Sequence, residues 1–579
     1  MQQAAHSKEI APARSVLAKR YGSFSLGSWC LLVLIPLVLY TYKLGDARAL
    51  TAHEILVAGP AKQMIQDDLW LLPRIGDQFW VEKPPLPYWL AALSCRIAGA
   101  FTEMSVRLPS AIAGVGVVLL VAGLMARLFG ETIGLLSGVV QATSTYMLAY
   151  ARLAEADILL LLILMAAISI FVFLQNLPED YPPRRRKLWL LSFWGLIGIT
   201  NLVKGPLFGA VLTLLTCLGW LVVSHEWAKL KRVWSLTGVM LAAGIALAWP
   251  AWVVHEEPAA LEIWNAHLFG RAAGTLGYTK PIWYYLTTWP TQLLPWTPLL
   301  FMGAGASLRR AWHDRKSPDR LIWWWALSHL CLLSISSGKH HHYLIYALPA
   351  LSPMIAMGMR RTAELMVAGT RWSLNWGRFW IWGVAPTTII AGYFAGRAAG
   401  ESQTDVWALA AMLFTGAVAI GYFTIHRRPV RTLVSFAMLV LLANLYVLGS
   451  VMPRRDPSAA DKQFLLAVDR DLPPGARVIA TSGGEISRHI FYLNRYVEGV
   501  WYPDDLQHVV KDEKTFFAIT RERNRDALDR VGRTTMLNQS RYTRREDETT
   551  DRYTLFRVDV TPQIADGAEV SRQAERSRH

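Results

Sequence analysis

Apolar stretches long enough to cross a membrane follow one another through most of this 579-residue chain. A helix needs roughly 20 mostly apolar residues to span a bilayer, because it rises only about 1.5 Å per residue. The ranges that fit this pattern are 24–42, 107–127, 132–150, 157–176, 187–203, 206–224, 232–254, 291–308, 321–338, 343–359, 378–397, 405–425 and 432–452. They predict a mainly α, polytopic membrane protein of about thirteen transmembrane helices.

One further apolar range, 87–101, is predicted to lie in the membrane interface instead of crossing it. It is short for a span, it follows Pro84 and Pro85 directly, and it contains Arg96. A helix of about 15 residues with an internal charge is typical of an interfacial segment.

The distribution of Lys and Arg supports this odd number of spans. Lys and Arg outnumber Asp and Glu by 59 to 43, and cytoplasmic loops of membrane proteins concentrate positive charge. With a cytoplasmic N-terminus, every predicted cytoplasmic loop is basic, at Arg127, 184–187, 229–232, 309–320, 360–378 and 427–431. A span at 87–101 would place all these loops outside. The pattern predicts a multi-pass membrane protein with a cytoplasmic N-terminus, and it explains the basic charge without a nucleic-acid partner.

The domain organisation follows from this topology. Residues 1–452 are predicted to form the transmembrane domain, with an outer loop at 43–106 that carries interfacial helices. Residues 453–562 are predicted to form a periplasmic α/β domain, with strands at 476–481, 516–520 and 553–558. The charged segment 563–579 is predicted to be a disordered tail.

Charged residues gather on the predicted outer side, where they are costly unless they pair or meet a ligand. Two carboxylates on separate loops, Glu54 and Asp157, are expected to frame a hydroxyl or amine nucleophile. Cations are the usual phosphate partners, and they would stabilise the charge that develops on a departing phosphate. The candidate phosphate ligands on this side are Lys83, Arg152, Lys204, Arg271 and Lys339.

Structural interpretations compete with each of these assignments. A Lys or Arg at the end of a span is commonly an anchor in the headgroup region. Asp157 near a span end is also explained as an acid favoured by the helix dipole, and Glu54 as a surface helix residue. The run His340-His341-His342 fits a hydrated loop. Glu82 and His267 are candidate ligands for a divalent ion, but two ligands from distant loops are weak evidence.

Several short motifs together resemble one family, the GT-C glycosyltransferases. The first outer loop resembles that of the lipid A aminoarabinose transferases and the protein O-mannosyltransferase-like family. The resemblance extends from about Phe24 to Pro453, and it rests on order and spacing. The motifs are His53-Glu54, Lys62-Gln63-Met64, Trp70-Leu71-Leu72-Pro73-Arg74, Glu82-Lys83-Pro84-Pro85, Arg107-Leu108-Pro109-Ser110, Arg152 with Asp157, Lys204-Gly205-Pro206, Lys280-Pro281, Leu294-Pro295-Trp296, and Lys339 with Tyr343-Leu344.

The resemblance implies transfer of a pentose or hexose from a polyprenyl-phosphate carrier to an acceptor on the outer, periplasmic face of the bacterial inner membrane. The implied reaction is a direct displacement that inverts the anomeric centre, with an acidic residue of the first loop assisting the acceptor. The family has Asp-Glu where this chain has His53-Glu54, so His53, Glu54 and Asp157 all stay candidates for the base. We expect Glu54, Lys83, Asp157, Lys204 and Tyr343 to converge on one outer cavity.

Two other functions share some of these features. A transporter or flippase of lipid-linked sugar precursors would need ionisable residues deep within the spans, and ranges 107–127, 132–150, 232–254 and 432–452 have none in their interiors. A membrane scaffold would depend on its C-terminal region alone. For a transferase, lipid A, another glycolipid and a protein all stay open as acceptors.

Overall fold

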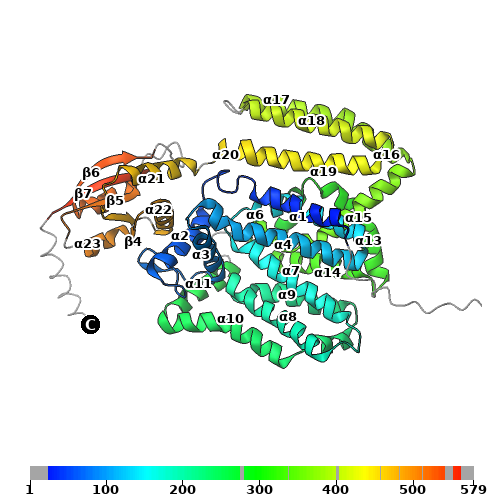
Figure 1. Ribbon diagram of the computed structural model, residues 1–579, viewed down its shortest axis with the longest axis horizontal. Helices are drawn as coiled ribbons and strands as arrows, with labels where there is room; N and C mark the ends of the chain where they lie inside the picture. The colour runs from blue at the N-terminus through cyan, green and yellow to red at the C-terminus, as the bar shows by residue number, and fades with distance from the viewer. Residues whose placement is uncertain are drawn as a thin grey trace, which may run out of the picture.

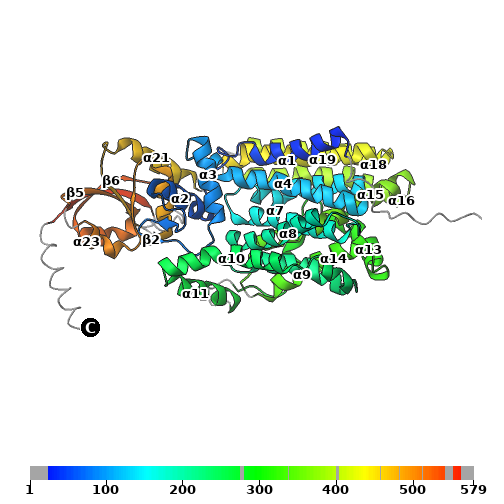
Figure 2. The same cartoon turned by 60° about the horizontal axis from the view of Figure 1, so that its bottom comes forward.

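The computed structural model describes residues 24–273, 279–336, 338–398, 403–454, 456, 458–481, 483–510, 513–540 and 552–561. Long helices lie side by side along the long axis of the molecule, and a small sheet lies beyond one end of them (Figures 1 and 2). A helix is present in each of the predicted spanning ranges. The mainly helical fold is therefore confirmed.

The helices that occupy the predicted spanning ranges extend as follows. They are α1 (Leu26–Thr41), α4 (Glu103–Phe129), α5 (Glu131–Thr143), α6 (Thr145–Tyr150), α7 (Ala156–Gln175), α8 (Pro183–Val203), α9 (Phe208–Val223), α10 (Leu236–Glu256), α13 (Thr297–His313), α14 (Pro318–Ile335), α15 (Leu348–Val367), α16 (Arg371–Phe379), α17 (Ala385–Ala398), α18 (Gln403–Ile425), α19 (Pro429–Tyr446) and α20 (Met452–Arg454).

Five helices in the described part of the chain are long and apolar enough to cross a membrane, by length and composition alone. They are α4, α7, α10, α18 and the continuous helix Pro429–Arg454. Helices α1 and α9 are shorter and also apolar. The total of about thirteen spans stays a prediction.

The predicted span 132–150 differs from the structure, because it is divided into α5 and α6. Ser144 is extended there, with φ −67° and ψ 140°, and its backbone N–H still closes α5 on the Val140 carbonyl. Neither Gly nor Pro lies beside Ser144 to signal the break.

The range 87–101 forms the short helix α3 (Leu86–Ala98), as predicted. Pro85 precedes its first residue, and Gly99 ends it in a left-handed conformation with φ 68°. A proline at the start and a glycine after the end are the usual limits of a helix. In both views α3 lies with α2 (Ala52–Asp67) between the long helices and the sheet.

The C-terminal region contains a five-stranded sheet in the order β4-β3-β5-β7-β6. Strand β3 is parallel to β4 and β5, whereas β7 is antiparallel to β5 and β6. Strands β3, β5 and β7 confirm the three predicted strands, while β4 and β6 were not predicted. The elements are α21 (Ala459–Asp471), β3 (Val478–Thr481), α22 (Ile486–Tyr492), β4 (Glu498–Val500), α23 (Leu506–Val509), β5 (Thr515–Arg521), α24 (Arg525–Asp529), β6 (Gly532–Gln539) and β7 (Tyr553–Val560).

One face of this sheet shares its apolar core with the first outer loop. Ile55 and Ala58 of α2 belong to the same buried cluster as Ile490 and Leu555 of the C-terminal region. A second cluster, which includes Phe516, lies within the C-terminal region alone. The helix that carries His53 and Glu54 is therefore held against the C-terminal region. The predicted boundary at 452/453 stays a prediction, and the predicted tail 563–579 lies outside the described residues.

Candidate functional site

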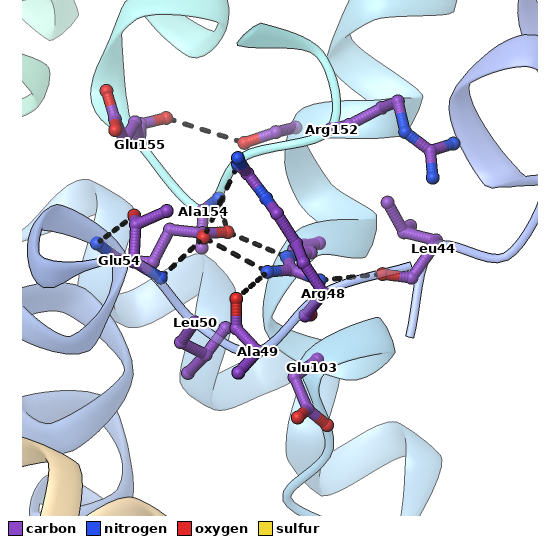
Figure 3. A network of polar contacts seen from close by, with 12 residues as sticks. Leu44, Arg48, Ala49, Leu50, Glu54, Glu103, Arg152, Ala154 and Glu155 are labelled. Atoms are coloured by element: carbon purple, nitrogen blue, oxygen red, sulfur yellow. Dashed lines mark hydrogen bonds and ion pairs between the residues drawn. The ribbon is translucent and has the colours of Figure 1, made fainter. Parts of the chain in front are cut away.

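Glu54 lies in the first turn of α2 and is completely buried. It forms a capping box with Thr51, in which each residue's side chain accepts a hydrogen bond from the backbone N–H of the other. Its two oxygens also accept hydrogen bonds from Arg107, from Nε at 2.7 Å and from Nη2 at 3.0 Å. The backbone N–H of Ala154 donates a further bond of 3.0 Å, and Figure 3 shows this contact between α2 and the loop before α7.

These contacts leave Glu54 with little capacity to accept a proton. Burial alone would raise the pKa of Glu54, but the charge and hydrogen bonds of Arg107 outweigh it and hold the pKa below its ordinary value. Arg107 is itself buried and donates to the carbonyls of Leu44, Arg48 and Ala49. Glu54 and Arg107 thus join α2, α4 and the loop 44–49 that precedes α2, so the contacts of Glu54 hold these segments in position.

Asp157 lies in the first turn of α7 and is the centre of a second polar cluster. Its Oδ1 accepts a hydrogen bond of 2.6 Å from Lys204 Nζ and one of 2.8 Å from the Tyr346 hydroxyl. Lys204 follows the last residue of α8, and its ammonium lies 4.5 Å from the centre of the Tyr343 ring. Burial would lower the pKa of Lys204, but the charge of Asp157 outweighs it and raises the pKa, so Lys204 stays a cation.

Tyr343 and Tyr346 belong to the short 3-10 helix η3 (His341–Tyr346), which also brings His342 to this cluster. The Nε2 atom of His342 lies 3.9 Å from Asp157 Oδ1. Burial lowers the pKa of His342 to about 3, so its imidazole is neutral near pH 7. The cluster therefore pairs one acid with one fixed cation, and it brings together the ends of α7, α8 and η3.

His53, at the outer surface of α2, lies within the electrostatic reach of this cluster. Its side chain is exposed. Partial enclosure by protein, followed by the charge of Lys83, lowers the pKa of His53, while Asp157 and Glu82 act in the opposite direction. Charges from two other predicted segments, at Glu82-Lys83 and at Asp157, therefore act on His53, whose own side chain is exposed to solvent.

Glu155 lies two positions before Asp157, and the sequence predicted no role for it. Its side chain points away from Glu54 in Figure 3. Burial and then the neighbouring Asp157 and Glu54 carboxylates raise the pKa of Glu155 to about 7, against the opposing charges of Lys83 and Lys204. This carboxyl is thus partly protonated near neutral pH.

Two predicted phosphate ligands, Arg152 and Lys339, donate hydrogen bonds to backbone carbonyls. Arg152 donates to the carbonyls of Leu39 and Lys43, at 2.8 and 3.4 Å. Lys339 donates to the carbonyls of Ser336 and Lys280, at 2.5 and 3.0 Å. Both side chains are buried, so the structure gives them a role in holding loops beside the cluster.

One of the two predicted metal ligands, His267, has a side chain outside the described residues. His267 and Arg271 lie in α11 (Ala260–Ala273), but their side chains are outside the described residues. Among the residues that are described, no group of three or more His, Cys, Asp or Glu has an arrangement that could hold a metal ion. The pair Glu82 and His267 stays a prediction.

Sequence reasoning missed the roles of Arg107 and Tyr346. Arg107 lies within a recognised motif, but its partner Glu54 is 53 positions away. Tyr346 follows Tyr343 by one turn of a 3-10 helix, and only that geometry shows that Tyr346 reaches Asp157 while Tyr343 lies beside Lys204. An aromatic residue beside an apolar range gives no such signal by itself.

The chain is similar in sequence to known glycosyltransferases. Residues 82–252 match the model of the dolichyl-phosphate-mannose-protein mannosyltransferase family. An undecaprenyl phosphate-alpha-4-amino-4-deoxy-L-arabinose arabinosyl transferase of Pectobacterium carotovorum is 28% identical over 372 residues, which are 63% of this chain and 61% of that protein. The corresponding transferase of Shewanella sediminis is 24% identical over 80% of this chain and 85% of its own length.

A solved structure has the same fold as this chain. It is ArnT from Cupriavidus metallidurans bound to undecaprenyl phosphate, with a TM-score of 0.72 and 16% identity over 92% of this chain and 98% of that chain. The apo form of that protein gives a TM-score of 0.71. The family match, the sequence relatives and this shared fold together confirm the resemblance to GT-C glycosyltransferases that the loop motifs predicted.

Proposed function

We propose that this relative of the GT-C glycosyltransferases moves a sugar from a polyprenyl-phosphate donor to a lipid acceptor at the outer face of a bacterial inner membrane. The names of its relatives favour 4-amino-4-deoxy-L-arabinose, a pentose, on undecaprenyl phosphate as the donor. Lipid A is the acceptor that we propose. The N-terminus would then be cytoplasmic, and the C-terminal region periplasmic, as the charge pattern predicts.

The observation that carries this proposal is the contact of Lys204 with both Asp157 and the Tyr343 ring. The charges of Asp157 and Lys83 both act on His53, which supports a place for His53 and Lys83 near this cluster. Lys204 uses one donor on Asp157 and keeps two for a phosphate. Lys83 supplies a second positive charge to the same region. Together they would stabilise the polyprenyl phosphate that leaves when the bond from the anomeric carbon to its oxygen breaks.

The base that we propose is His53. In a direct displacement the acceptor oxygen bonds to the anomeric carbon and gives up its proton as the phosphate leaves. A neutral imidazole accepts such a proton, and the lowered pKa keeps His53 neutral at pH 7. Glu54 is less suited, because Arg107, Thr51 and Ala154 all donate to its oxygens.

Transfer by the purified protein tests this proposal. The protein would be reconstituted in vesicles with lipid A and polyprenyl phosphate that carries aminoarabinose, and the product read by mass spectrometry. Asp157→Asn releases Lys204, and we expect transfer to fall by at least about a hundredfold. Asp180→Asn, at an exposed position, is the matched control and should transfer at the normal rate.

Two results would oppose the proposal. One is the absence of sugar transfer by the normal protein with any polyprenyl-phosphate sugar. The other is equal transfer by the Asp157→Asn and Asp180→Asn variants. Movement of the lipid across the vesicle membrane without sugar transfer would favour the flippase.

A further inference from the structure

The short segment Ala49–Leu50, which leads into α2, has all four of its backbone polar groups bound by side chains. Ala49 N–H donates to Asp456 at 2.6 Å, and Leu50 N–H donates to the Tyr492 hydroxyl at 2.8 Å. The Leu50 carbonyl accepts from Arg488 at 3.1 Å. The Ala49 carbonyl accepts from Arg107 at 3.0 Å. Three of these four partners follow residue 452.

Two residues of the C-terminal region, Tyr492 and Lys462, also bind Glu103. The Tyr492 hydroxyl, which accepts from Leu50, also donates to Glu103 at 3.2 Å, and Lys462 forms an ion pair with Glu103. Glu103 lies in the first turn of α4. The C-terminal region thus binds both the entrance to α2 and the start of a long apolar helix.

Helix α2 is held along its length as well as at its entrance. Lys62 donates to the carbonyls of Phe491 and Leu493, at 3.2 and 2.8 Å. A Cβ atom added at Gly59 would lie 2.6 Å from Ser487 Cβ, so the two helices touch without room for a side chain. Burial lowers the pKa of Lys62 to about 8, and its two bonds go to carbonyl groups.

We propose that Asp456, Tyr492 and Arg488 form a clamp that sets the position of His53 at the active site, an inference that rests on the proposed function. The clamp ends at Leu50, only three residues before His53. Thr51 and Glu54 then fix the first turn of α2 through their capping box. The C-terminal region would therefore hold the proposed base in place through the backbone of Ala49 and Leu50. The clamp residues are positioning residues.

Tyr492→Phe tests the clamp, because it removes one hydroxyl and keeps the buried ring. We expect kcat for transfer to fall by about tenfold, since small misplacement of a reacting group is costly. The KM for the donor should change by less than about twofold, because Lys83 and Lys204 are not in the clamp. Tyr496→Phe, at a position that is 64% exposed in the same region, is the matched control.

Hydrogen exchange of the peptide that contains Leu50 gives a second measurement, which does not need transfer activity. Tyr492→Phe should speed exchange there by about fivefold, the equivalent of one lost hydrogen bond. Asp456→Ala, which removes the neighbouring bond, should act in the same direction if Tyr492→Phe fails to fold.

The outcomes separate the clamp from the proposed function. Faster exchange with an unchanged kcat would overturn the positioning role, and unchanged exchange in both variants would overturn the clamp itself. If the normal protein transfers no sugar, the proposed function fails, while the exchange measurement still decides whether the C-terminal region holds this segment.

Discussion

Residues His53 and Glu54 are neighbours in the sequence, but their surroundings differ sharply. His53 is exposed, whereas Glu54 has no exposed surface and pairs with Arg107, which is also buried. Removal of one partner from a buried ion pair leaves an uncompensated charge, which costs about 3–5 kcal/mol. The loss of an exposed imidazole costs little stability.

Variants at these two positions should therefore separate catalysis from stability. We expect His53→Gln to keep the thermal midpoint of the normal protein and to lower transfer by at least about a hundredfold. Glu54→Gln should lower the midpoint strongly, because Arg107 loses its charged partner. Unfolding in detergent, followed alongside transfer, measures both effects. A stable Glu54→Gln protein without activity would instead identify Glu54 as the base.

The Glu155 carboxyl should make stability depend on pH. Burial raises its pKa to about 7, so the folded state binds the proton more tightly than the unfolded state. The stabilisation of the folded state by this proton is fully present below about pH 4 and is lost as the pH rises to about 7. Glu155→Gln removes the charge, so its thermal midpoint should fall less between pH 5 and pH 8 than that of the normal protein. Glu179→Gln, at an exposed position, should behave like the normal protein.

At the scale of elements, the contact between α2 and α22 leaves no space for an added methyl group. Gly59→Ala places a Cβ 2.6 Å from Ser487 Cβ and 2.7 Å from its Cα. We expect a loss of about 1–3 kcal/mol, seen as a lower thermal midpoint. Gly244→Ala is the control, because this glycine of α10 has no atom within 4 Å of the added Cβ. That change should raise stability slightly through helix propensity. Equal midpoints for both variants would mean that α2 and α22 are not tightly packed.

The same scale shows which elements the sequence can reveal. Apolar ranges such as 157–176 predict helices well, because their length and composition are set by the membrane. The break at Ser144 has no Gly or Pro beside it that would mark it in the sequence. Strand β4 has three residues, and β6 is largely exposed along its length. Neither therefore has the apolar alternation that marks a strand.

The sequence also predicted only part of the candidate site, namely the residues but not their pairing. The sequence identified Asp157 and Lys204 as candidates because charged residues gather on the predicted outer side, where they are costly unless they pair or meet a ligand. It did not identify which of them pair, since Asp157 and Lys204 are 47 positions apart and Tyr346 is 189 positions from Asp157. Arg152 has the same sequence signal as Lys204, yet it binds carbonyl groups.

At the scale of the whole molecule, the proposed orientation places the two ends of the helical bundle in different compartments. In a variant with its four cysteines replaced by serine, Tyr502→Cys should react with an impermeant maleimide added to spheroplasts, which expose the periplasmic side. Arg185→Cys should react only after the membrane is permeabilised. Both positions are exposed. The reverse pattern would invert the topology derived from the basic loops.

The binding of Ala49 and Leu50 by distant residues also bears on how the molecule is made. Asp456 and Tyr492 lie 407 and 442 positions after their partners. Because a ribosome completes the early segments first, the first outer loop must wait for nearly the whole chain to be translated and exported before its final bonds can form. A nascent chain would thus acquire its reactive geometry only as biosynthesis ends, and a prematurely terminated product would reach the membrane without it.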